Sequence, residues 1–490
     1  MATNKGVFVI YTGGTIGSMP KDMNDPDSPQ VVVSWNEFMS RTPELSEETI
    51  GFRIDSWSFP DPLDSCNIGR AEWQMMADKI GEKYKEYEGF VILHGTDSMV
   101  YTASALSFML ANLAKPVVIT GAQRAHLFQV RNDALQNIIT AVQLANPAAS
   151  RLPTIPEVVI AFGQDVLRGN RTRKKDANGY AAYQSPKFPP LAKVGANIVV
   201  DETRILPLPD KAFYVRRNLD ERVITFDVFP GIQHSKFAAK LLSDADLRGV
   251  VVRAYGAGNI PTDPKFLAQF EAATKRGVTV LNVTQCTEGR VELGLYETSN
   301  LLLSIGMVSG TDLTPEAALV KLMIGLGDED INDDPYALRD FLQTSQAGEQ
   351  STTILEVPFR SDRGGAVSAE TPILRLAPSK ELGGDWDGRS LEAAQLRLIG
   401  AKIVGDEPLE LEVYANLSSN EAPGGPDTQQ FAGSFRRSPT EGETILAFDV
   451  TNATKRLFSP GQRSPFTIVV KSGDSQLSWT RAELALFVKV

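Results

Sequence analysis

The stretch Val7-Phe-Val-Ile-Tyr-Thr-Gly-Gly-Thr15 decides the fold class of this chain. Its first five residues are apolar and predict a buried strand. A second stretch repeats the arrangement, because Phe90-Val-Ile-Leu93 is followed by His94-Gly-Thr-Asp97. After each polar turn comes a segment that can start a helix. The pair therefore predicts an α/β sheet with threonines and a carboxylate at the carboxyl ends of two strands, the edge where such sheets bind ligands.

The same alternation of strand and helix continues over residues 1–200. Apolar runs at 116–120 and 157–162 predict further strands, separated by helical stretches such as 98–113. This pattern indicates a parallel sheet covered on both faces. We therefore expect a larger N-terminal α/β domain over residues 1–200.

A smaller α/β domain is expected next. The proline-rich run Leu206-Pro-Leu-Pro209 predicts a connection over 201–221, and strand signals resume near 222–228. Thr314 followed by Pro315 predicts a helix start, with threonine as N-cap and proline at the first helical position. The second domain is therefore placed at 222–346.

The composition and periodicity change after this domain. Residues 347–390 are rich in Gly, Ser, Asp and Pro, which predicts a linker with one strand at 353–359. From 391 the chain alternates apolar and polar residues, as in Leu409-Glu-Leu-Glu-Val-Tyr-Ala415. Short alternating strands with turn signals between them predict a β-sandwich over 391–490.

Composition excludes several classes of protein. The chain has 490 residues and a formal net charge of −11, which argues against a nucleic-acid or anionic-membrane partner. The chain has only two cysteines, which excludes a disulfide framework, and its three histidines lack metal-ligand spacing, which argues against a zinc site. With no long apolar run to span a bilayer, a cytoplasmic protein that needs no cofactor or metal is expected.

Threonine chemistry needs an activating group, because a free threonine hydroxyl is a poor nucleophile. Either Thr12 or Thr15 is a candidate nucleophile. Thr96, Asp97 and a lysine from the segment 171–175 are candidates for the group that removes its proton. The Gly-Gly pair of the first motif allows close backbone approach and supplies N–H groups for an oxyanion. Alone, each signal has an ordinary structural explanation, such as a turn or a helix cap; their convergence favours a site.

The two motifs resemble a known family. Tyr11-Thr-Gly-Gly-Thr-Ile-Gly17 and Leu93-His-Gly-Thr-Asp-Ser-Met99 are similar to the signatures of the bacterial L-asparaginase/glutaminase family, closest to its intracellular type I branch. The resemblance covers roughly residues 5–345. Further similar stretches are Ile119-Thr-Gly-Ala-Gln-Arg124, Val130-Arg-Asn-Asp133, Leu167-Arg-Gly-Asn-Arg-Thr172, Tyr255-Gly-Ala-Gly-Asn-Ile-Pro261 and Thr284-Gln-Cys286.

This resemblance implies hydrolysis of the asparagine side-chain amide in two steps. Thr12 would attack the amide, ammonia would leave, and water would cleave the acyl-enzyme. Thr96, Lys174 and Asp97 would form the activating triad, Lys174 rather than Lys175 matching the family spacing.

The resemblance also implies the substrate contacts. Asp97 would hold the α-ammonium group, and Asp64 and Ser65 would hold the α-carboxylate. Backbone N–H groups near Thr96 would form part of the oxyanion hole. Asn259 matches a residue that the family donates across a dimer interface, so a homodimer or homotetramer is expected.

Three features depart from the family pattern. The loop from Ser18 to Gln30 lacks the tyrosine that usually lies near the nucleophile. Arg173 replaces the threonine of the type I effector pocket, although Arg253 and Cys286 match that pocket. The C-terminal β-rich region is an addition to the family core.

Other functions remain open from the sequence. One is a preference for glutamine, since an extra methylene is worth only about 1–3 kcal/mol of discrimination. A second is the amidotransferase relative that releases ammonia for tRNA charging, against which the acidic charge argues. A third is a weakly active or inactive asparagine-binding scaffold that acts through the β-sandwich.

Overall fold

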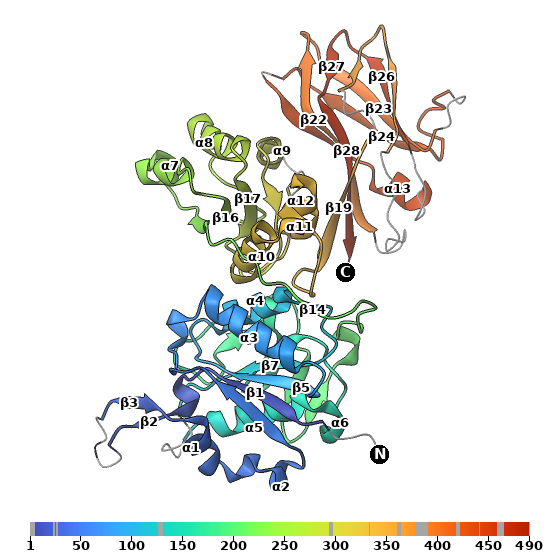
Figure 1. Cartoon of the computed structure of the whole chain (residues 1–490). Coiled ribbons are helices and arrows are strands. Elements are labelled where there is room, and N and C mark those ends of the chain that lie inside the picture. Colours follow the sequence, from blue (N-terminus) through green and yellow to red (C-terminus); the bar gives the residue numbers. More distant parts are fainter. Residues whose placement is uncertain are drawn as a thin grey trace. The chain divides into compact units, whose positions relative to one another are not determined.

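The chain forms two compact units, each assembled from separate parts of the sequence. The first contains Met1–Glu221, Leu313–Asn332 and Gln346–Glu349; the second contains Arg222–Asp312, Asp333–Ser345 and Gln350–Val490. The structure is a computed structural model (Figure 1). It describes residues 5–22, 25, 28–125, 131–293, 297–332, 334–359, 364–378, 391–417, 422–440, 442–457 and 465–489.

The first unit is built on a mostly parallel sheet with strand order β13-β12-β9-β8-β7-β5-β1-β4. The first motif follows β1 and the second follows β5, its neighbour. In their parallel register Tyr11 lies opposite Leu93, so both motifs begin at the same level of the sheet edge. The strands are β1 (Val7–Tyr11), β4 (Ile54–Ser58), β5 (Gly89–Leu93), β7 (Val117–Thr120), β8 (Val158–Phe162), β9 (Asp165–Arg168), β12 (Ala192–Val194) and β13 (Ile198–Val200).

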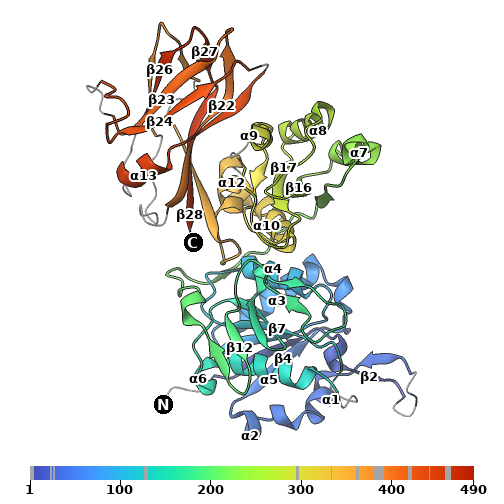
Figure 2. The ribbon, with the colours of Figure 1, turned by 180° about the vertical axis from the view of Figure 1, so that it is seen from behind.

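Helices cover both faces of this sheet. α3 (Arg70–Lys83) and α4 (Met99–Met109) lie on one face and α5 (Ala134–Ala145) on the other (Figures 1 and 2). Every residue of β1 and β5 is buried, because alternate side chains enter the two helix-covered layers. The predicted α/β architecture with a parallel sheet is therefore confirmed.

The second unit starts with a smaller parallel sheet. Its strand order is β15-β16-β17-β18, and α8 (Pro264–Lys275) contributes Phe266 and Phe270 to the core beside it. The prediction that a smaller α/β domain follows the first is thus confirmed. The strands are β15 (Val223–Asp227), β16 (Gly249–Ala254), β17 (Thr279–Thr284) and β18 (Val308–Ser309).

The helix predicted after Thr314 is α10 (Pro315–Gly327), and it belongs to the first unit. Thr314 Oγ1 accepts a hydrogen bond from the backbone N–H of Ala317 at 3.1 Å, which is the expected N-cap. α10 packs against α4. The chain therefore returns to the first unit after the smaller sheet is complete.

The C-terminal extension is antiparallel and β-rich. In its described residues, two sheets share one hydrophobic cluster, to which Leu396, Leu411, Phe448 and Leu484 contribute. Their packing as a β-sandwich remains a prediction. One sheet contains β19 (Thr352–Pro358), β28 (Arg481–Lys489), β22 (Leu391–Val404), β27 (Gln476–Ser478), β20 (Ala366–Val367) and β25 (Thr444–Asp449); the other contains β21 (Ile373–Leu376), β26 (Phe466–Ser472), β23 (Leu409–Ala415) and β24 (Phe431–Arg437).

The two stretches expected as linkers contain ordered elements. Within 347–390, β19, β20 and β21 join the C-terminal sheets, because Val367 and Leu376 supply apolar side chains to the shared cluster. Residues 379–390 lie outside the described part. Within 201–221, β14 (Tyr214–Val215) pairs with β6 (Leu110–Ala111). A composition typical of linkers is therefore compatible with short strands in both stretches.

Candidate active site

The turns of the two threonine motifs touch each other. The backbone N–H and the Oγ1 hydroxyl of Thr12 both donate to the carbonyl of Leu93, at 3.1 and 2.9 Å. Gly14 has a φ of 81°, and a Cβ there would lie 2.8 Å from the Cα of Gly95. Only glycine accommodates both the left-handed backbone and this approach. The motifs therefore form one site, in which Thr12 is fully buried and Thr15 is exposed.

The loop that carries Asp64 and Ser65 lies against both turns. The N–H of Leu63 donates to the carbonyl of Thr12 at 2.8 Å, and the N–H of Asp97 donates to Ser65 Oγ at 3.2 Å. Ser65 is buried, whereas Asp64 is exposed and accepts from the N–H of Cys66 at 3.2 Å. The structure thus brings the predicted substrate loop to both threonine motifs. Ser65 of this loop lies more than 30 residues before Asp97 of the second motif in the sequence.

Lys174 joins the second motif from a short strand that lies outside the eight-stranded sheet. Its Nζ donates to Thr96 Oγ1 at 3.0 Å and to Asp97 Oδ1 at 2.8 Å. Thr96 Oγ1 lies 3.5 Å from Gln123 Oε1, the acceptor for its own proton. The Lys174 side chain is 19% exposed and that of Asp97 is 68% exposed. The three residues expected to form a triad are therefore in contact at the edge of the site.

Tyr183 is a site residue that the sequence prediction missed. β10 (Arg173–Lys174) pairs with β11 (Tyr183–Gln184), and Tyr183 lies directly opposite Lys174. Its hydroxyl donates to the carbonyl of Thr96 at 2.5 Å. Burial, assisted by the charge of Asp97, raises the pKa of Tyr183, so the hydroxyl keeps its proton and remains a donor. Asn178-Gly179 is a hairpin signal that pointed to this pairing.

His94 has a structural role in the second motif. It is fully buried; Nδ1 lies 2.6 Å from the carbonyl of Gly95, and Nε2 lies 2.9 Å from Thr102 Oγ1. A carbonyl accepts only, so Nδ1 carries the proton and Nε2 accepts from Thr102. Burial lowers the pKa of His94 to about 4, against the opposing effect of the Gly95 carbonyl. The imidazole is therefore neutral near pH 7.

Acid is expected to destabilise the protein through His94. Unfolded histidine binds a proton below a pKa of about 6.5, whereas folded His94 does so only near 4. Stability is therefore lost as the pH falls from 6.5 to 4, by about 3 kcal/mol in total. His94→Gln should remove this part of the pH dependence in urea unfolding at pH 4.5 and 7. His234 is exposed, and His234→Gln is the control. If His94→Gln lost as much stability between pH 7 and pH 4.5 as the wild type, the low pKa given to His94 would be contradicted.

Three further predicted residues belong to the second unit. Arg253 is the penultimate residue of β16 and pairs with Asp227 at 3.0 Å, while Cys286 follows the adjacent strand β17. Their strands are parallel neighbours, so both residues lie at the carboxyl ends of the smaller sheet. The backbone of Asn259 exchanges hydrogen bonds with that of Tyr255 at 2.9 and 2.8 Å. Their expected roles in an effector pocket and at a dimer interface remain predictions.

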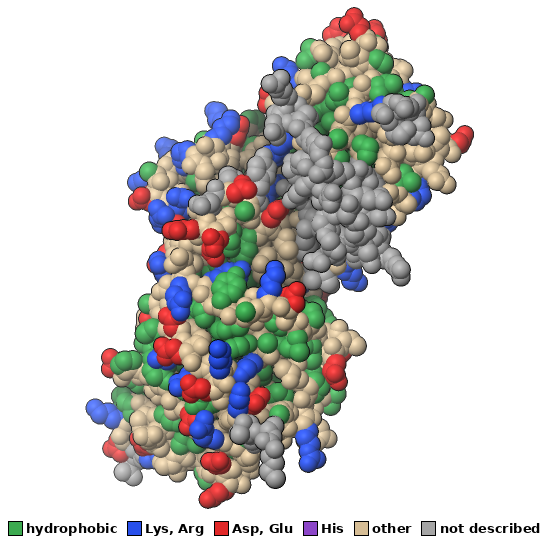
Figure 3. All heavy atoms as spheres, turned by 45° about the vertical axis from the view of Figure 1, so that its right-hand side comes forward, with side chains coloured by type: hydrophobic (Ala, Val, Ile, Leu, Met, Phe, Trp, Pro, Cys, Tyr) green, Lys and Arg blue, Asp and Glu red, His purple; other side chains and the backbone are tan. Residues whose placement is uncertain are grey.

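The surface charges are mixed in sign. On the face shown in Figure 3, Lys and Arg side chains are interspersed with Asp and Glu. Among the described residues, no helix is both long and apolar enough to cross a membrane. In the same residues, no cluster of three or more His, Cys, Asp or Glu side chains is arranged to hold a metal ion.

Known proteins are similar to this chain in sequence and in fold. Residues 6–206 match the family model "Asparaginase, N-terminal", and residues 222–339 match "Glutaminase/Asparaginase C-terminal domain". L-asparaginase 1 of Escherichia coli K12 is 37% identical over 329 residues, which cover 66% of this chain and 93% of that protein. The solved L-asparaginase I of Vibrio cholerae has a TM-score of 0.63 and 35% identity, covering 71% of this chain and 100% of the other.

A third relative has a different name. The human 60 kDa lysophospholipase is 35% identical over 393 residues, covering 76% of this chain and 67% of that protein. Together the fold and these matches define an amidohydrolase. The chain belongs to the asparaginase/glutaminase family and resembles its type I members.

Proposed function

We propose that this protein hydrolyses L-asparagine to L-aspartate and ammonia through an acyl-enzyme on Thr12. The observation that best supports this is the contact of Lys174 with both Thr96 and Asp97, beside the turn that carries Thr12. A lysine and a carboxylate around a hydroxyl are the means of moving a proton that a threonine nucleophile lacks on its own.

The first proposed step is acylation. The Thr12 hydroxyl turns away from the Leu93 carbonyl, which holds its proton in this structure, and attacks the substrate amide carbon. A bond forms between Oγ1 and that carbon, and backbone N–H groups near Thr96 stabilise the oxyanion. The proton passes through Thr96 and Lys174 to the amide nitrogen. The C–N bond then breaks and ammonia leaves.

The second proposed step is deacylation. Water attacks the ester carbon, and the same group accepts the water proton and returns it to Oγ1 of Thr12. Aspartate leaves and the enzyme is restored. Asp97, whose carboxylate remains largely exposed beside Lys174, holds the substrate α-ammonium group. The Asp64–Ser65 loop holds the α-carboxylate through hydroxyl and N–H donors.

Steady-state ammonia release from L-asparagine and from L-glutamine tests this function. We expect a higher kcat/KM for asparagine, by about tenfold or more, because the pocket must reject one extra methylene. A preference for glutamine would place the chain among glutaminases. Absence of ammonia release from either substrate would overturn the proposal, and lysophosphatidylcholine hydrolysis would then support the activity named for the human relative.

An inactive binding protein is the second candidate. The observation that favours it is the absence of tyrosine between Ser18 and Gln30, a loop that lies partly outside the described residues. Asparagine binding in a calorimeter without ammonia release would support it. A cytoplasmic location and a homodimer or homotetramer also belong to the proposal, and the mass in solution tests the latter.

A further inference from the structure

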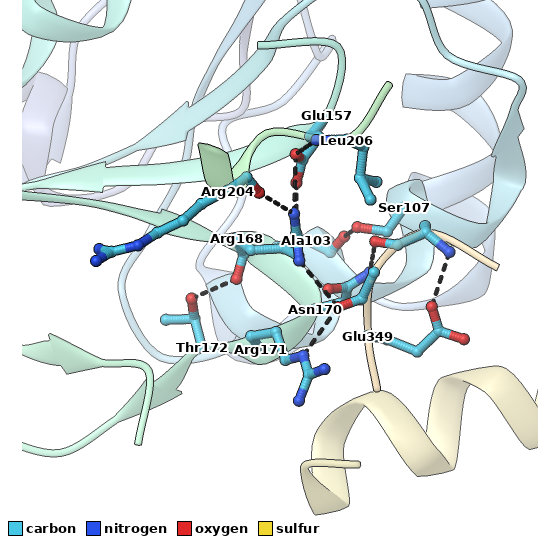
Figure 4. A network of polar contacts seen from close by, with 12 residues as sticks. Ala103, Ser107, Glu157, Arg168, Asn170, Arg171, Thr172, Arg204, Leu206 and Glu349 are labelled. Atoms are coloured by element: carbon cyan, nitrogen blue, oxygen red, sulfur yellow. Dashed lines mark hydrogen bonds and ion pairs between the residues drawn. The ribbon is translucent and has the colours of Figure 1, made fainter. Parts of the chain in front are cut away.

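A short segment from late in the sequence contacts the residues that precede Lys174 (Figure 4). This segment, Gln346–Glu349, belongs to the first unit although the residues on either side of it belong to the second. The carbonyl of Ala347 accepts from Asn170 Nδ2 at 2.9 Å, and the carbonyl of Gly348 accepts from Arg171 Nε at 2.8 Å. Its contacts therefore end three residues before Lys174. We refer to Gln346–Glu349 as the clamp segment.

The clamp segment is itself held by a buried ion pair. Glu349 and Lys321 are fully buried, and Lys321 Nζ lies 2.6 Å from Glu349 Oε1. The same carboxylate accepts from the N–H groups of Gln346 and Ala347, at 2.9 and 2.7 Å. Burial alone would raise the pKa of Glu349, but the Lys321 charge and these bonds lower it, so the carboxylate stays ionised. The position of the two carbonyls is thus set by charge-assisted bonds.

Arg168 connects the clamp segment to the sheet. Its guanidinium is held by Glu157, with Nη2 at 3.0 Å from Oε1, and also donates to the carbonyl of Gly348 at 3.3 Å. A cavity of about 170 Å³ borders Glu157 and Ala347. Hydrogen bonds rather than close packing therefore hold this side of the clamp segment.

A second anchor lies next to Lys174. Arg173 Nε lies 3.1 Å from Glu316 Oε1, and Glu316 is on α10, the helix that also carries Lys321. Arg173 and Lys174 together make up the short strand β10. A strand of two residues has little hydrogen bonding of its own, so its placement depends on these flanking contacts.

We propose that the clamp segment and Glu316 position Lys174 against Thr96 and Asp97. This inference rests on the proposed function and adds positioning residues to it. The clamp holds residues 168–171, Glu316 holds Arg173, and Lys174 Nζ is thereby placed 3.0 Å from the Thr96 hydroxyl. Misplacement of a catalytic group by about 1 Å costs about 100-fold in rate. Loss of the clamp should therefore lower kcat more than it changes KM.

Gly348→Ala is the direct test. Gly348 has a φ of 73°, and a Cβ there would lie 2.7 Å from the Arg168 guanidinium, which Glu157 prevents from moving freely. Gly51→Ala is the matched control, because Gly51 has a φ of 87° with nothing within 4 Å of the added Cβ. We expect kcat to fall about tenfold or more in Gly348→Ala, with KM within about threefold, and both constants to be unchanged in Gly51→Ala.

A second readout does not depend on turnover. The rate of reductive methylation of Lys174, followed by mass spectrometry, should rise severalfold in Gly348→Ala and remain unchanged in Gly51→Ala. If the wild type releases no ammonia but this rise occurs, the positioning stands and the proposed function fails. If the wild type is active and folded Gly348→Ala retains both its kcat and the original methylation rate, the positioning is overturned.

A milder pair of variants keeps the test valid if Gly348→Ala does not fold. Arg173→Met removes the contact with Glu316, whereas Arg173→Lys keeps a positive charge within reach of the same carboxylate. We expect a lower kcat and faster Lys174 methylation in Arg173→Met, with substantial recovery of both in Arg173→Lys. Equal behaviour of all three proteins would contradict a positioning role for this anchor.

Discussion

Replacing Thr12 by valine is expected to lower kcat for asparagine hydrolysis by about 10⁴-fold or more, the scale on which loss of a nucleophile acts. Valine has nearly the same shape as threonine but has no Oγ1, so no acyl-enzyme forms. The substrate contacts at Asp97 and Ser65 remain, and asparagine should still bind. Ammonia release measures the first effect and calorimetric titration the second.

Thr120→Val is the matched control for this variant. Thr120 is the last residue of β7, whereas Thr12 directly follows β1. Like Thr12, Thr120 is fully buried and donates from Oγ1 to a carbonyl of a neighbouring strand, that of Ala161, at 2.7 Å. Both variants lose one buried hydrogen bond, at a cost of about 1 kcal/mol in stability. Only Thr12→Val should lose activity. Retention of more than about a tenth of kcat would exclude Thr12 as nucleophile and turn attention to Thr15.

Replacing Lys174 by methionine is expected to have the second large effect. We expect kcat to fall by about 10²- to 10⁴-fold, as it does when a general acid–base group is removed. Methionine keeps the length of the side chain but removes the donor that lies between Thr96 and Asp97. Stability should change little, because the Asp97 carboxylate is 68% exposed and water replaces its partner. Ammonia release and urea unfolding measure the two quantities.

Lys175→Met provides the control for Lys174. Lys175 is the next residue, is exposed, and pairs through its backbone N–H with the carbonyl of Ala182 at 2.8 Å. Its side chain can be changed without altering that hydrogen bond. Activity within about twofold of wild type is expected. If Lys175→Met were the inactive variant and Lys174→Met active, the choice of lysine from the family spacing would be wrong.

The sequence predicted the fold class and the meeting of the motifs because both depend on local patterns. Apolar runs identified β1 and β5, and parallel strands place the residues that follow them at one sheet edge. Lys174 came from the family spacing rather than from periodicity. Tyr183 was missed because its role depends on a hairpin register, although Asn178-Gly179 signals that turn.

Other parts of the site have no local signal. The buried pair of Lys321 and Glu349 is formed by residues that composition assigns to an ordinary helix and to a linker. Nothing in the periodicity around Glu349 indicates that its carboxylate is fully buried or that Gly348 supplies an acceptor to Arg171. Such contacts follow from the return of the chain to the first unit, which is a long-range property of the topology.

This return has a consequence for biosynthesis. Synthesis must proceed through residue 349 of 490 before the first unit has all of its parts, because α10 and Glu349 belong to it. Until then α4 lacks its partner α10, and Arg168 and Arg171 lack the carbonyl that accepts from both. Domains of a nascent chain commonly fold in order from the N-terminus. Here the first unit cannot be complete until residue 349 has been synthesised, so the contacts of Gln346–Glu349 with Asn170 and Arg171 can form only after the strands of the N-terminal sheet have been made.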